Sequence, residues 1–376
     1  MPTPDPFTFP GNAPGGTPAG RAGLPEPGPD SLLPVRAWCP GRVNLIGDHT
    51  DYNGGIALPM AIDLGIEVTF TPDRRQQVLF RSSSEPQAAA VDVGTAFDPG
   101  RFQKIEPAWA RFVAAVISLV RPVYGGTGAV TATLPMASGL SSSAALEVAV
   151  ALALGLRDNP LAVAELCQRA EQAATGVQTG ILDQLAVCAG VEGAALLVDC
   201  TDRTVEPVVL PEGLEVVVVH SGEHRTLAAT AYRTRREECA IAAAHLGPLG
   251  AIDPKAVFTL VDPTVRRRAR HVVTECDRVR WCVEALRTGD LLEAGRLLTA
   301  SHASLATDFE VSTPALDALV EQLTARPGVY GARMTGAGFG GCVVTLSAPG
   351  ALDPASFPTP AWRVRAAAGA TVSPLE

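Results

Sequence analysis

The chain has 376 residues, enough for about two domains with a substantial core, and its formal net charge at pH 7 is −9. This acidic balance excludes a surface built to bind nucleic acid or an anionic membrane, and no apolar run is long enough to cross a bilayer. The eight cysteines include no CxxC pair and the N-terminus carries no leader-like pattern, so we expect buried thiols in a reducing cytoplasm, not zinc ligands or disulfides.

Residues 1–34 are crowded with proline and glycine, and we predict that they form a disordered tail. After this tail, hydrophobic periodicity predicts strands and helices in a mixed order. We expect strands at 35–39, 65–70, 77–82, 128–134, 193–199 and 214–220. We expect helices at 109–121, 142–156, 160–174 and 180–189.

The C-terminal half has a mostly helical pattern. Helices are predicted at about 228–246, 263–288, 290–304 and 314–325. Two strands are predicted at the end of this region, at 329–334 and 342–347. This mixed order indicates an α+β protein and not a regularly alternating βαβ sheet.

The densest polar cluster is GRVNLIGDHTDYNGG, residues 41–55, which its glycines are expected to keep loop-like. Its polar members are Arg42, Asn44, Asp48, His49, Asp51, Tyr52 and Asn53. Asp48 and Asp51 are acceptors suited to hydroxyl groups, and His49 can donate or accept. Such a group fits a polyol, whereas one histidine with two aspartates lacks a convincing set of metal ligands. The alternative is a solvated, turn-rich loop.

The stretch PMASGLSSSAALEVA, residues 135–149, changes from small residues into a helix-forming pattern. A helix N-terminus carries unpaired N–H groups and a partial positive charge, so small residues there let a phosphate approach the backbone. The alternative is a serine-capped helix after a turn. The only lysines, Lys104 and Lys255, do not lie near this run, which excludes a GK[ST] P-loop and the strand lysine of protein kinases. A phosphate loop here would depend on backbone N–H groups, serine and a metal.

Two further segments contain candidate functional residues. In AEQAATGVQTGILDQ, residues 170–184, Glu171 lies on a predicted helix and Asp183 opens the next apolar segment. One of these carboxylates could bind Mg²⁺ while the other faces a substrate hydroxyl, or both could be ordinary surface acids. In RMTGAGFGGCVVTL, residues 333–346, four glycines indicate backbone packed against a ligand or another loop, or else a tight hairpin without function.

Together, in order and spacing, these motifs resemble the signatures of the GHMP small-molecule kinases over nearly all of residues 35–347. Within that superfamily, GRVNLIGDHTDYNGG is similar to the galactokinase signature. The stretches TAYRTRREEC (230–239), RARHVVTE (268–275) and SHASLATDFEVSTPALD (301–317) also resemble galactokinase segments. The resemblance implies a two-lobed α+β GHMP kinase fold with the active site in the cleft between the lobes. It also implies an N-terminal domain at 35–210 and a C-terminal domain at 211–376.

The resemblance also assigns roles to individual residues. It implies that the ATP phosphates are wrapped at a helix N-terminus by Ala137, Ser138, Gly139, Leu140, Ser141, Ser142 and Ser143. Ser143 and Glu171 would hold Mg²⁺, and Asp183 would be the catalytic base. Arg42 would lie near the transferring phosphoryl group, where it can serve the base or stabilise developing charge; the sequence leaves both roles open. The implied sugar contacts are Asp48, His49, Thr50, Asp51 and Tyr232.

Three positions depart from the family's usual residues: Asp48 replaces glutamate, Ala337 a glycine and Cys39 an alanine. The first shortens a carboxylate that would face the sugar, and the others are small packing changes. We expect an ATP-dependent kinase for the anomeric hydroxyl of galactose, acting in the cytoplasm without nucleic-acid or membrane partners. A monomer is favoured, but the sequence does not determine the oligomeric state. The alternatives are a kinase for another hexose and a non-catalytic galactose sensor. The intact GLSSSAAL loop, with Glu171 and Asp183, favours the enzyme.

Overall fold

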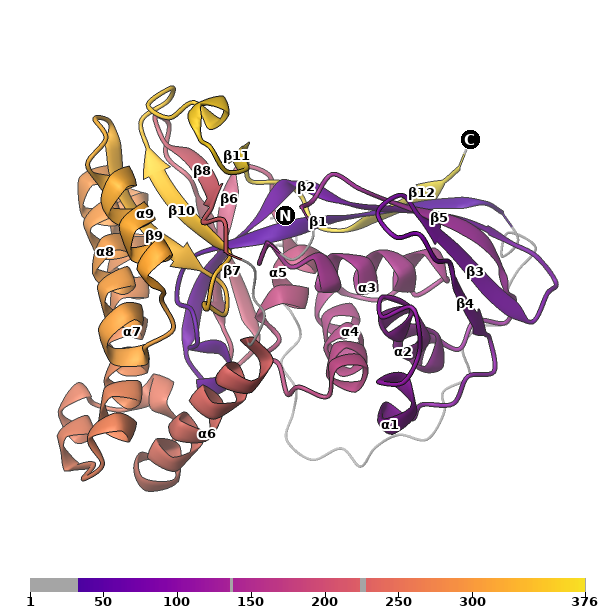
Figure 1. The fold of residues 1–376 in the computed structure, drawn as a ribbon, viewed down its shortest axis with the longest axis horizontal. Coiled ribbons are helices and arrows are strands. Elements are labelled where there is room, and N and C mark those ends of the chain that lie inside the picture. Colours follow the sequence, from indigo (N-terminus) through magenta and orange to yellow (C-terminus); the bar gives the residue numbers. More distant parts are fainter. Residues whose placement is uncertain (1–32, 136–137, 224–227, 376) are drawn as a thin grey trace, which may run out of the picture.

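The computed structural model describes residues 33–135, 138–223 and 228–375. Most of the predicted tail, residues 1–32, and Ala137 of the predicted phosphate loop lie outside these ranges. Figure 1 shows an elongated molecule in which one large sheet with its helices fills one end. A smaller sheet and a second group of helices fill the other end.

In the described part of the chain, the larger sheet is eight-stranded, with the order β12-β1-β2-β5-β3-β4 and with β6 paired to β2 and β7 to β6. Its strands are β1 Val35–Ile46, β2 Ile56–Pro72, β3 Gln77–Ser82, β4 Ala89–Asp92, β5 Gly126–Ala132, β6 Ala194–Asp199, β7 Thr204–Val209 and β12 Thr371–Pro374. Strands β3 and β5 pair in parallel, and the other ladders are antiparallel.

Helices cover one face of this sheet (Figure 1). They are α1 Pro99–Phe102, α2 Ala110–Val120, α3 Ser142–Ala153, α4 Pro160–Thr175 and α5 Leu182–Ala189. Local signals fix α4: the Asn159 side chain accepts the N–H of Ala162, Pro160 opens the helix, and Gly176 ends it with φ +71°. Helix α3 packs against β1 and β2 and also contacts α2, α4 and α5, which explains why its residues 144–153 are all buried.

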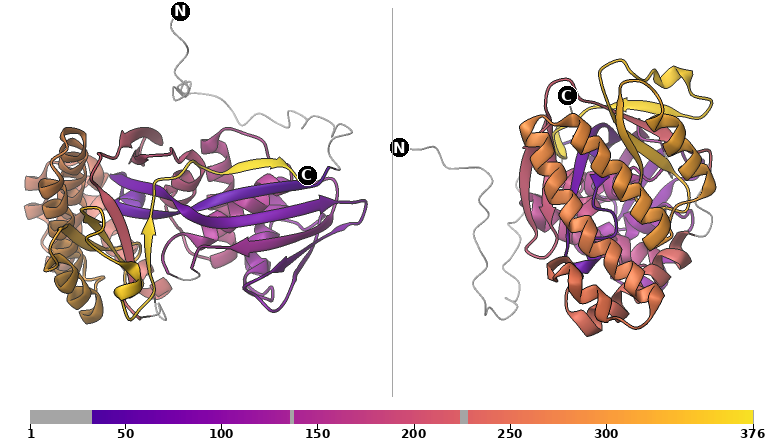
Figure 2. Two further views of the ribbon diagram at one scale, coloured as in Figure 1. Left: turned by 90° about the horizontal axis from the view of Figure 1, so that it is seen from above. Right: turned by 90° about the vertical axis from the view of Figure 1, so that its left-hand side faces the viewer.

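The smaller sheet has the order β11-β8-β10-β9 and is antiparallel throughout its described strands. These strands are β8 Glu215–His220, β9 Val329–Thr335, β10 Cys342–Ser347 and β11 Ala361–Val364. The accompanying helices are α6 Ala228–Leu246, α7 Pro263–Thr288, α8 Leu291–Ser304 and α9 Pro314–Thr324. Short turns complete this end: 3₁₀ helices at Leu249–Ala251, Pro254–Thr259 and Pro354–Ser356, and a π-helical turn at Leu305–Phe309. The right-hand view of Figure 2 shows the long helices covering the end of the molecule.

The α+β class is confirmed, and the observed α2 to α9 begin and end within a few residues of the predicted ranges. The prediction that the first strand stops before Pro40, with Arg42 and Asn44 in a loop, is wrong. A register shift between Pro40 and Gly41 lets the ladder with β2 continue past the proline, so β1 runs to Ile46. Four short strands, β4, β7, β11 and β12, were not predicted from the sequence. Strand β12, near the C-terminus, pairs with β1 in the larger sheet, so the chain crosses back from one end of the molecule to the other. The predicted boundary between an N-terminal and a C-terminal domain at residues 210 and 211 therefore stays a proposal.

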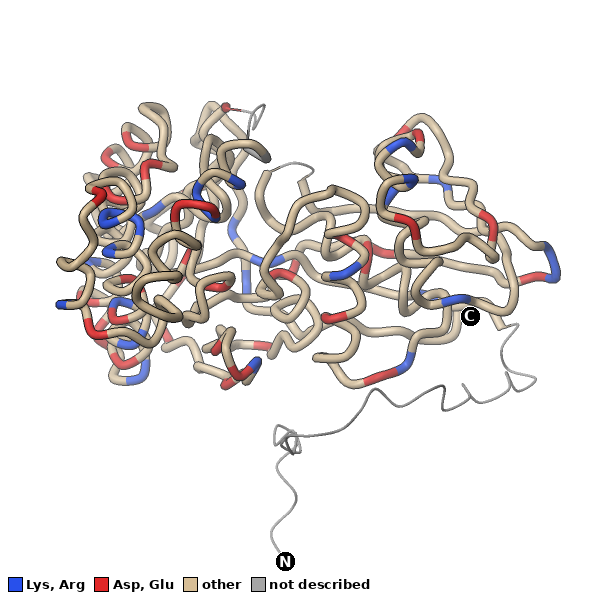
Figure 3. Tube along the Cα trace, turned by 90° about the horizontal axis from the view of Figure 1, so that it is seen from below, with Lys and Arg blue, Asp and Glu red and all other residues tan. Residues whose placement is uncertain are grey.

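Apolar and charged residues are both distributed along the described part of the chain. Within residues 33–135, 138–223 and 228–375, no helix is long and apolar enough to cross a bilayer. Figure 3 shows acidic and basic residues interspersed along the trace, with several in ion pairs such as Arg296 with Glu293.

Candidate active site

Three of the four candidate segments meet at one cavity of about 340 Å³: residues 41–55 (the first motif), 170–184 (the second motif) and 333–346 (the third motif). One wall of the cavity is formed by residues from the end of β1 and the loop after it, and a second wall by residues from α4 and α5. Residues from α6 and from the loop after β9 complete the cavity. The candidate residues that line this cavity are Arg42, Asp48, His49, Asp51, Glu171, Asp183 and Tyr232. Ala337, one of the three departures, lines it as well.

Arg42 and Asp183 form a close ion pair on the cavity wall. Arg42 Nη2 lies 2.6 Å and Nε 2.9 Å from Asp183 Oδ1, while Nη1 donates to the Gly139 carbonyl at 2.6 Å. The Arg42 side chain is only 7% exposed, whereas that of Asp183 is 31% exposed, so the carboxylate is the open member of the pair. A Cβ on Gly41 would lie 2.7 Å from the Leu140 carbonyl, so glycine permits the serine loop to lie this close to β1.

Ser141 connects the serine loop to the same carboxylate. Its hydroxyl donates to Asp183 Oδ2 at 2.6 Å, and its backbone has the left-handed φ of +60° that non-glycine residues adopt only under constraint. Ser141 does not cap α3 with its side chain, which contradicts the serine-cap alternative for this residue. Ser138 instead donates to the Pro135 carbonyl at 2.8 Å, within the loop, and Ser142 is the first residue of α3.

Ser143 on α3 and Glu171 on α4 face each other. The Ser143 hydroxyl donates to Glu171 Oε1 at 2.7 Å, while Oε2 accepts from Thr179 at 3.0 Å and from Gln184 at 2.9 Å. Burial, and next the charge of Asp183, raises the pKa of Glu171. A hydroxyl and one carboxylate at a helix N-terminus fit Mg²⁺, which takes oxygen ligands and shares them with phosphates and water. In the described residues no group of three or more His, Cys, Asp or Glu side chains could hold a metal, so most ligands would have to come from substrate and solvent.

His49 also lines the cavity, and the backbone of Ala337 lies close to its ring. Its Nδ1 lies 2.9 Å from the Tyr52 hydroxyl, while its buried Nε2 finds no hydrogen-bond partner among the described residues. The ring packs against Phe309 with centroids 4.6 Å apart and against Tyr232 at 5.8 Å. Burial, and next the charges of His271 and Arg333, lowers the pKa of His49 well below its usual value. A neutral ring with one free nitrogen suits a ligand hydroxyl.

The Asp51 carboxylate lies against Gly180, two residues before α5 begins at Leu182. A Cβ at Gly180 would be 1.6 Å from Asp51 Oδ2, so any other residue type at this position would displace the carboxylate. Burial, and next the charge of Asp183, raises the pKa of Asp51 to about 6. Two carboxylates from different walls of the cavity therefore lie close together, a costly arrangement that is typical of functional sites.

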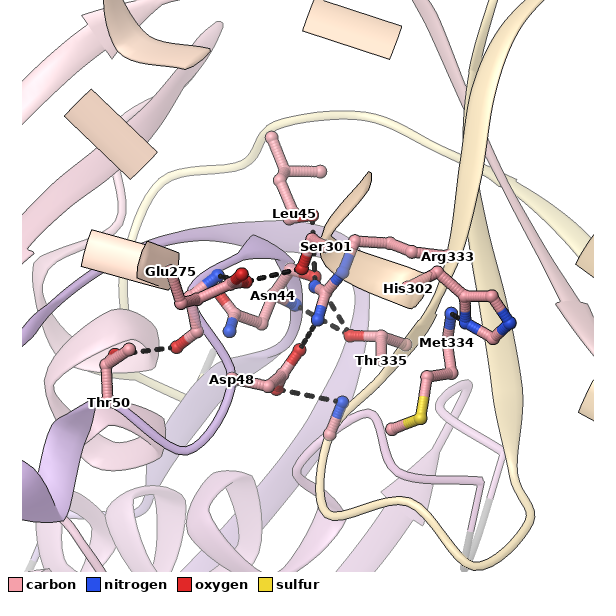
Figure 4. A network of polar contacts seen from close by, with 12 residues as sticks. Asn44, Leu45, Asp48, Thr50, Glu275, Ser301, His302, Arg333, Met334 and Thr335 are labelled. Carbon is pink, nitrogen blue, oxygen red and sulfur yellow. Dashed lines mark hydrogen bonds and ion pairs between the residues drawn. The ribbon is translucent and has the colours of Figure 1, made fainter. Parts of the chain in front are cut away.

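Asp48 is held from the protein side by both of its oxygens (Figure 4). Oδ2 forms an ion pair with Arg333 Nη2, and Oδ1 accepts the N–H of Gly336 at 3.1 Å. The fully buried Arg333 also donates through Nη1 to the β1 carbonyls of Asn44 and Leu45, at 3.2 and 3.1 Å. The short carboxylate is thus tied to the third motif while it still lines the cavity.

The Thr50 side chain does not line the cavity. It is fully buried, and its hydroxyl lies 2.8 and 2.9 Å from the carbonyls of Gly47 and Ile56. Thr50 closes the turn between β1 and β2, and its predicted contact with the sugar stays a prediction.

Sequence reasoning missed several residues at this site. Arg333 opens the third motif, but only the glycines of that motif were weighed. Glu275 ends the quoted stretch RARHVVTE and accepts the N–H of Gly47 at 3.0 Å. Burial alone would raise its pKa, but the positive charge of Arg278, followed by His271 and Arg333, lowers it to about 2. Gln184 and Thr179, which hold Glu171, lie within the segment of residues 170–184, but only the two carboxylates of that segment were considered.

Family models match three parts of the chain. The galactokinase galactose-binding signature matches residues 31–72, the GHMP kinase N-terminal domain 111–191 and the GHMP kinase C-terminal domain 282–354. Human galactokinase is 41% identical over 349 residues, which cover 87% of each chain. The chain belongs to the galactokinase family. Galactokinase from Mycobacterium tuberculosis H37Rv is 42% identical over 330 residues, covering 84% of this chain and 89% of that relative.

Solved structures agree with this membership. Lactococcus lactis galactokinase complexed with galactose matches with a TM-score of 0.82 and 30% identity, covering 90% of this chain and 95% of that chain. Methanococcus jannaschii mevalonate kinase has a TM-score of 0.64 at 19% identity and covers 88% and 98% of the two chains, which shows the common GHMP fold. The two-lobed GHMP kinase fold expected from the sequence is therefore confirmed.

Proposed function

We propose that this chain transfers the γ-phosphoryl group of ATP to the anomeric hydroxyl of galactose, giving galactose 1-phosphate and ADP. It is a sugar kinase of the galactokinase family with ATP as co-substrate. The observation that carries the residue roles is the Arg42–Asp183 pair on the cavity wall, beside the serine loop and the N-terminus of α3.

Asp183 acts as the general base. One of its oxygens is bound by Arg42 and the other by Ser141, which fixes the carboxylate plane while leaving it partly exposed to the cavity. As the sugar oxygen attacks the γ-phosphorus, its proton passes to Asp183, and the bond between that phosphorus and the oxygen bridging to the β-phosphate breaks. Arg42 lies where it can also stabilise charge that develops on the phosphoryl group.

The ATP phosphates bind at the N-terminus of α3. The first N–H groups of α3 have no side-chain cap, so they are free to bind phosphate oxygens, and the helix dipole favours negative charge at this end. Ser138, Gly139, Leu140, Ser141, Ser142 and Ser143 supply the loop and the first turn. Ser143 and Glu171 would hold Mg²⁺, which supplies positive charge against the phosphates.

The sugar binds between the loop after β1 and α6. His49 Nε2 offers an unpartnered buried nitrogen, Asp51 an acceptor beside Asp183, and Tyr232 an aromatic wall against His49. Asp48 contributes from the side of the third motif. A sugar hydroxyl at His49 Nε2 would satisfy a buried group that is otherwise costly to leave unpaired.

Two further parts of the proposal concern the protein in the cell. We propose a monomer in the cytoplasm, with galactose and ATP as its partners. Support for the cytoplasmic location comes from the cysteines, which are buried or half-buried in the structure.

Transfer of label from γ-labelled ATP to a panel of hexoses tests the proposed function. We expect galactose to be labelled fastest and phosphorus NMR to identify galactose 1-phosphate. Faster labelling of another hexose would support the alternative sugar kinase. Galactose binding without any transfer would support the sensor. Either result would overturn the proposal.

A further inference from the structure

Behind the proposed metal ligand lies a buried acid that the reaction does not use. Glu147 sits on α3, one turn after Ser143, and its side chain is fully buried. Its Oε2 lies 3.3 Å from Gln184 Nε2, and its Oε1 finds no hydrogen-bond partner among the described residues. Buried acids without a full set of partners are uncommon and costly, so this one calls for a physical explanation.

Gln184 joins this acid to Glu171. Its fully buried amide nitrogen donates to Glu171 Oε2 at 2.9 Å and to Glu147 Oε2 at 3.3 Å. The two donors of one amide group are therefore divided between two acidic side chains from α3 and α4. Gln184 itself lies on α5, next to Asp183.

The orientation of this amide determines how Glu171 is held. With its nitrogen end toward Glu171, Gln184 fixes Oε2 together with Thr179, which leaves Oε1 facing Ser143. With the amide reversed, its carbonyl oxygen would face the Glu171 carboxylate and repel it. Gln184 Oε1 has no hydrogen-bond partner among the described residues, whereas the amide nitrogen has two acceptors, and the acceptor on Glu147 adds to the preference for the observed orientation that Glu171 already provides.

We propose that Glu147 is a positioning residue that, through Gln184, holds the Glu171 carboxylate in the orientation needed to bind the metal of the ATP complex. This inference rests on the proposed function of Glu171. Ligand-orienting groups behind a metal ligand commonly change metal affinity by about 10- to 100-fold when they are removed. Burial, and next the charge of Glu171, raises the pKa of Glu147 well above its usual value, which is consistent with a neutral acid that accepts from Gln184.

Two substitutions at this position separate hydrogen bonding from packing. Glu147→Gln keeps the length and a carbonyl acceptor for Gln184, whereas Glu147→Met fills a similar volume without an acceptor. We expect Glu147→Met to raise the Mg²⁺ concentration needed for half-maximal ATP use about tenfold or more, and Glu147→Gln to stay within about threefold of wild type. The control is Val148→Ala, at the next buried position of α3, which should leave the Mg²⁺ requirement unchanged.

Calorimetric titration of Mg²⁺–ATP, without sugar, gives a readout that does not depend on turnover. We expect Glu147→Met to weaken this binding while galactose affinity is retained. The inference is overturned if Glu147→Met binds Mg²⁺–ATP like wild type, or if Glu147→Gln loses as much affinity as Glu147→Met. Should Glu147→Met fail to fold, Gln184→Met tests the same connection and should show the same loss. A wild-type protein that does not phosphorylate galactose would overturn the proposed function, while the titration would still test the role of Glu147.

Discussion

At the scale of single residues, Asp51 shows that the arrangement of the site lowers the stability of the protein without ligand. Its carboxylate lies on Gly180, close to Asp183, and burial followed by that neighbouring charge raises its pKa to about 6. An aspartate in the unfolded chain titrates near pH 3.9. Because the folded-state pKa is the higher one, the contribution of Asp51 to stability is fully present below about pH 4 and is lost as the pH rises through about 6.

Asp51→Asn should therefore stabilise the protein while it weakens sugar binding. Asparagine has a similar shape but does not ionise, so the unfolding midpoint should exceed that of wild type at pH 8, with a smaller difference at pH 5. Thermal unfolding at the two pH values measures this, and galactose titration measures the loss of affinity. A variant that is less stable than wild type at pH 8 would show that the ionised carboxylate has a stabilising partner.

The contacts of Asp48 predict how the site would respond to glutamate, the longer residue that the family usually has at this position. Both oxygens of Asp48 already contact the third motif, through Arg333 and Gly336. An added methylene would push the carboxylate toward the cavity, so Asp48→Glu should raise the Michaelis constant for galactose roughly tenfold, a typical cost of overpacking. Steady-state kinetics with galactose and with ATP separate the effects, since the constant for ATP should not change. A lower constant for galactose together with a narrower range of accepted hexoses would instead indicate a water-bridged, permissive site.

At the scale of elements, the sequence predicted the helices well but not the extent of β1. Caps such as Asn159 with Pro160, and the Gly176 stop, are local signals, and α4 follows them closely. The extension of β1 past Pro40 depends instead on pairing with β2 and on a register shift, which are long-range features. This extension of β1 is what places Arg42 at the site. The motifs identified most of the cavity residues, whereas Gln184, Glu147 and Arg333 act through contacts between elements that no local pattern encodes.

Arg333 joins the two sheets, because it lies on β9 and binds the β1 carbonyls of Asn44 and Leu45 as well as Asp48. Arg333→Met removes a buried charge and leaves Asp48 buried without its partner. We expect a loss of about 3–5 kcal/mol in the free energy of unfolding, measured by urea denaturation. The control is Arg296→Met, which breaks the exposed pair with Glu293 and should change little. Equal stability of the two variants would show that the buried pair is not a structural link.

At the scale of the whole molecule, the site exists only when both ends of the chain's fold are in place. The loop after β1, the serine loop and the carboxylates of α4 and α5 come from the first half of the chain, while Tyr232 and the loop after β9 come from the second half. The cavity is therefore formed by side chains from both halves of the chain.

The most direct test of this account is the turnover of Asp183→Asn beside its affinities for galactose and Mg²⁺–ATP. Asparagine keeps the shape of Asp183 but cannot take up the proton, so turnover should fall by about 10²- to 10⁴-fold. Calorimetry should show both ligands still bound with affinities near those of wild type, and circular dichroism should show an unchanged fold. A variant that keeps more than half of the wild-type turnover would contradict the assignment of Asp183 as the base.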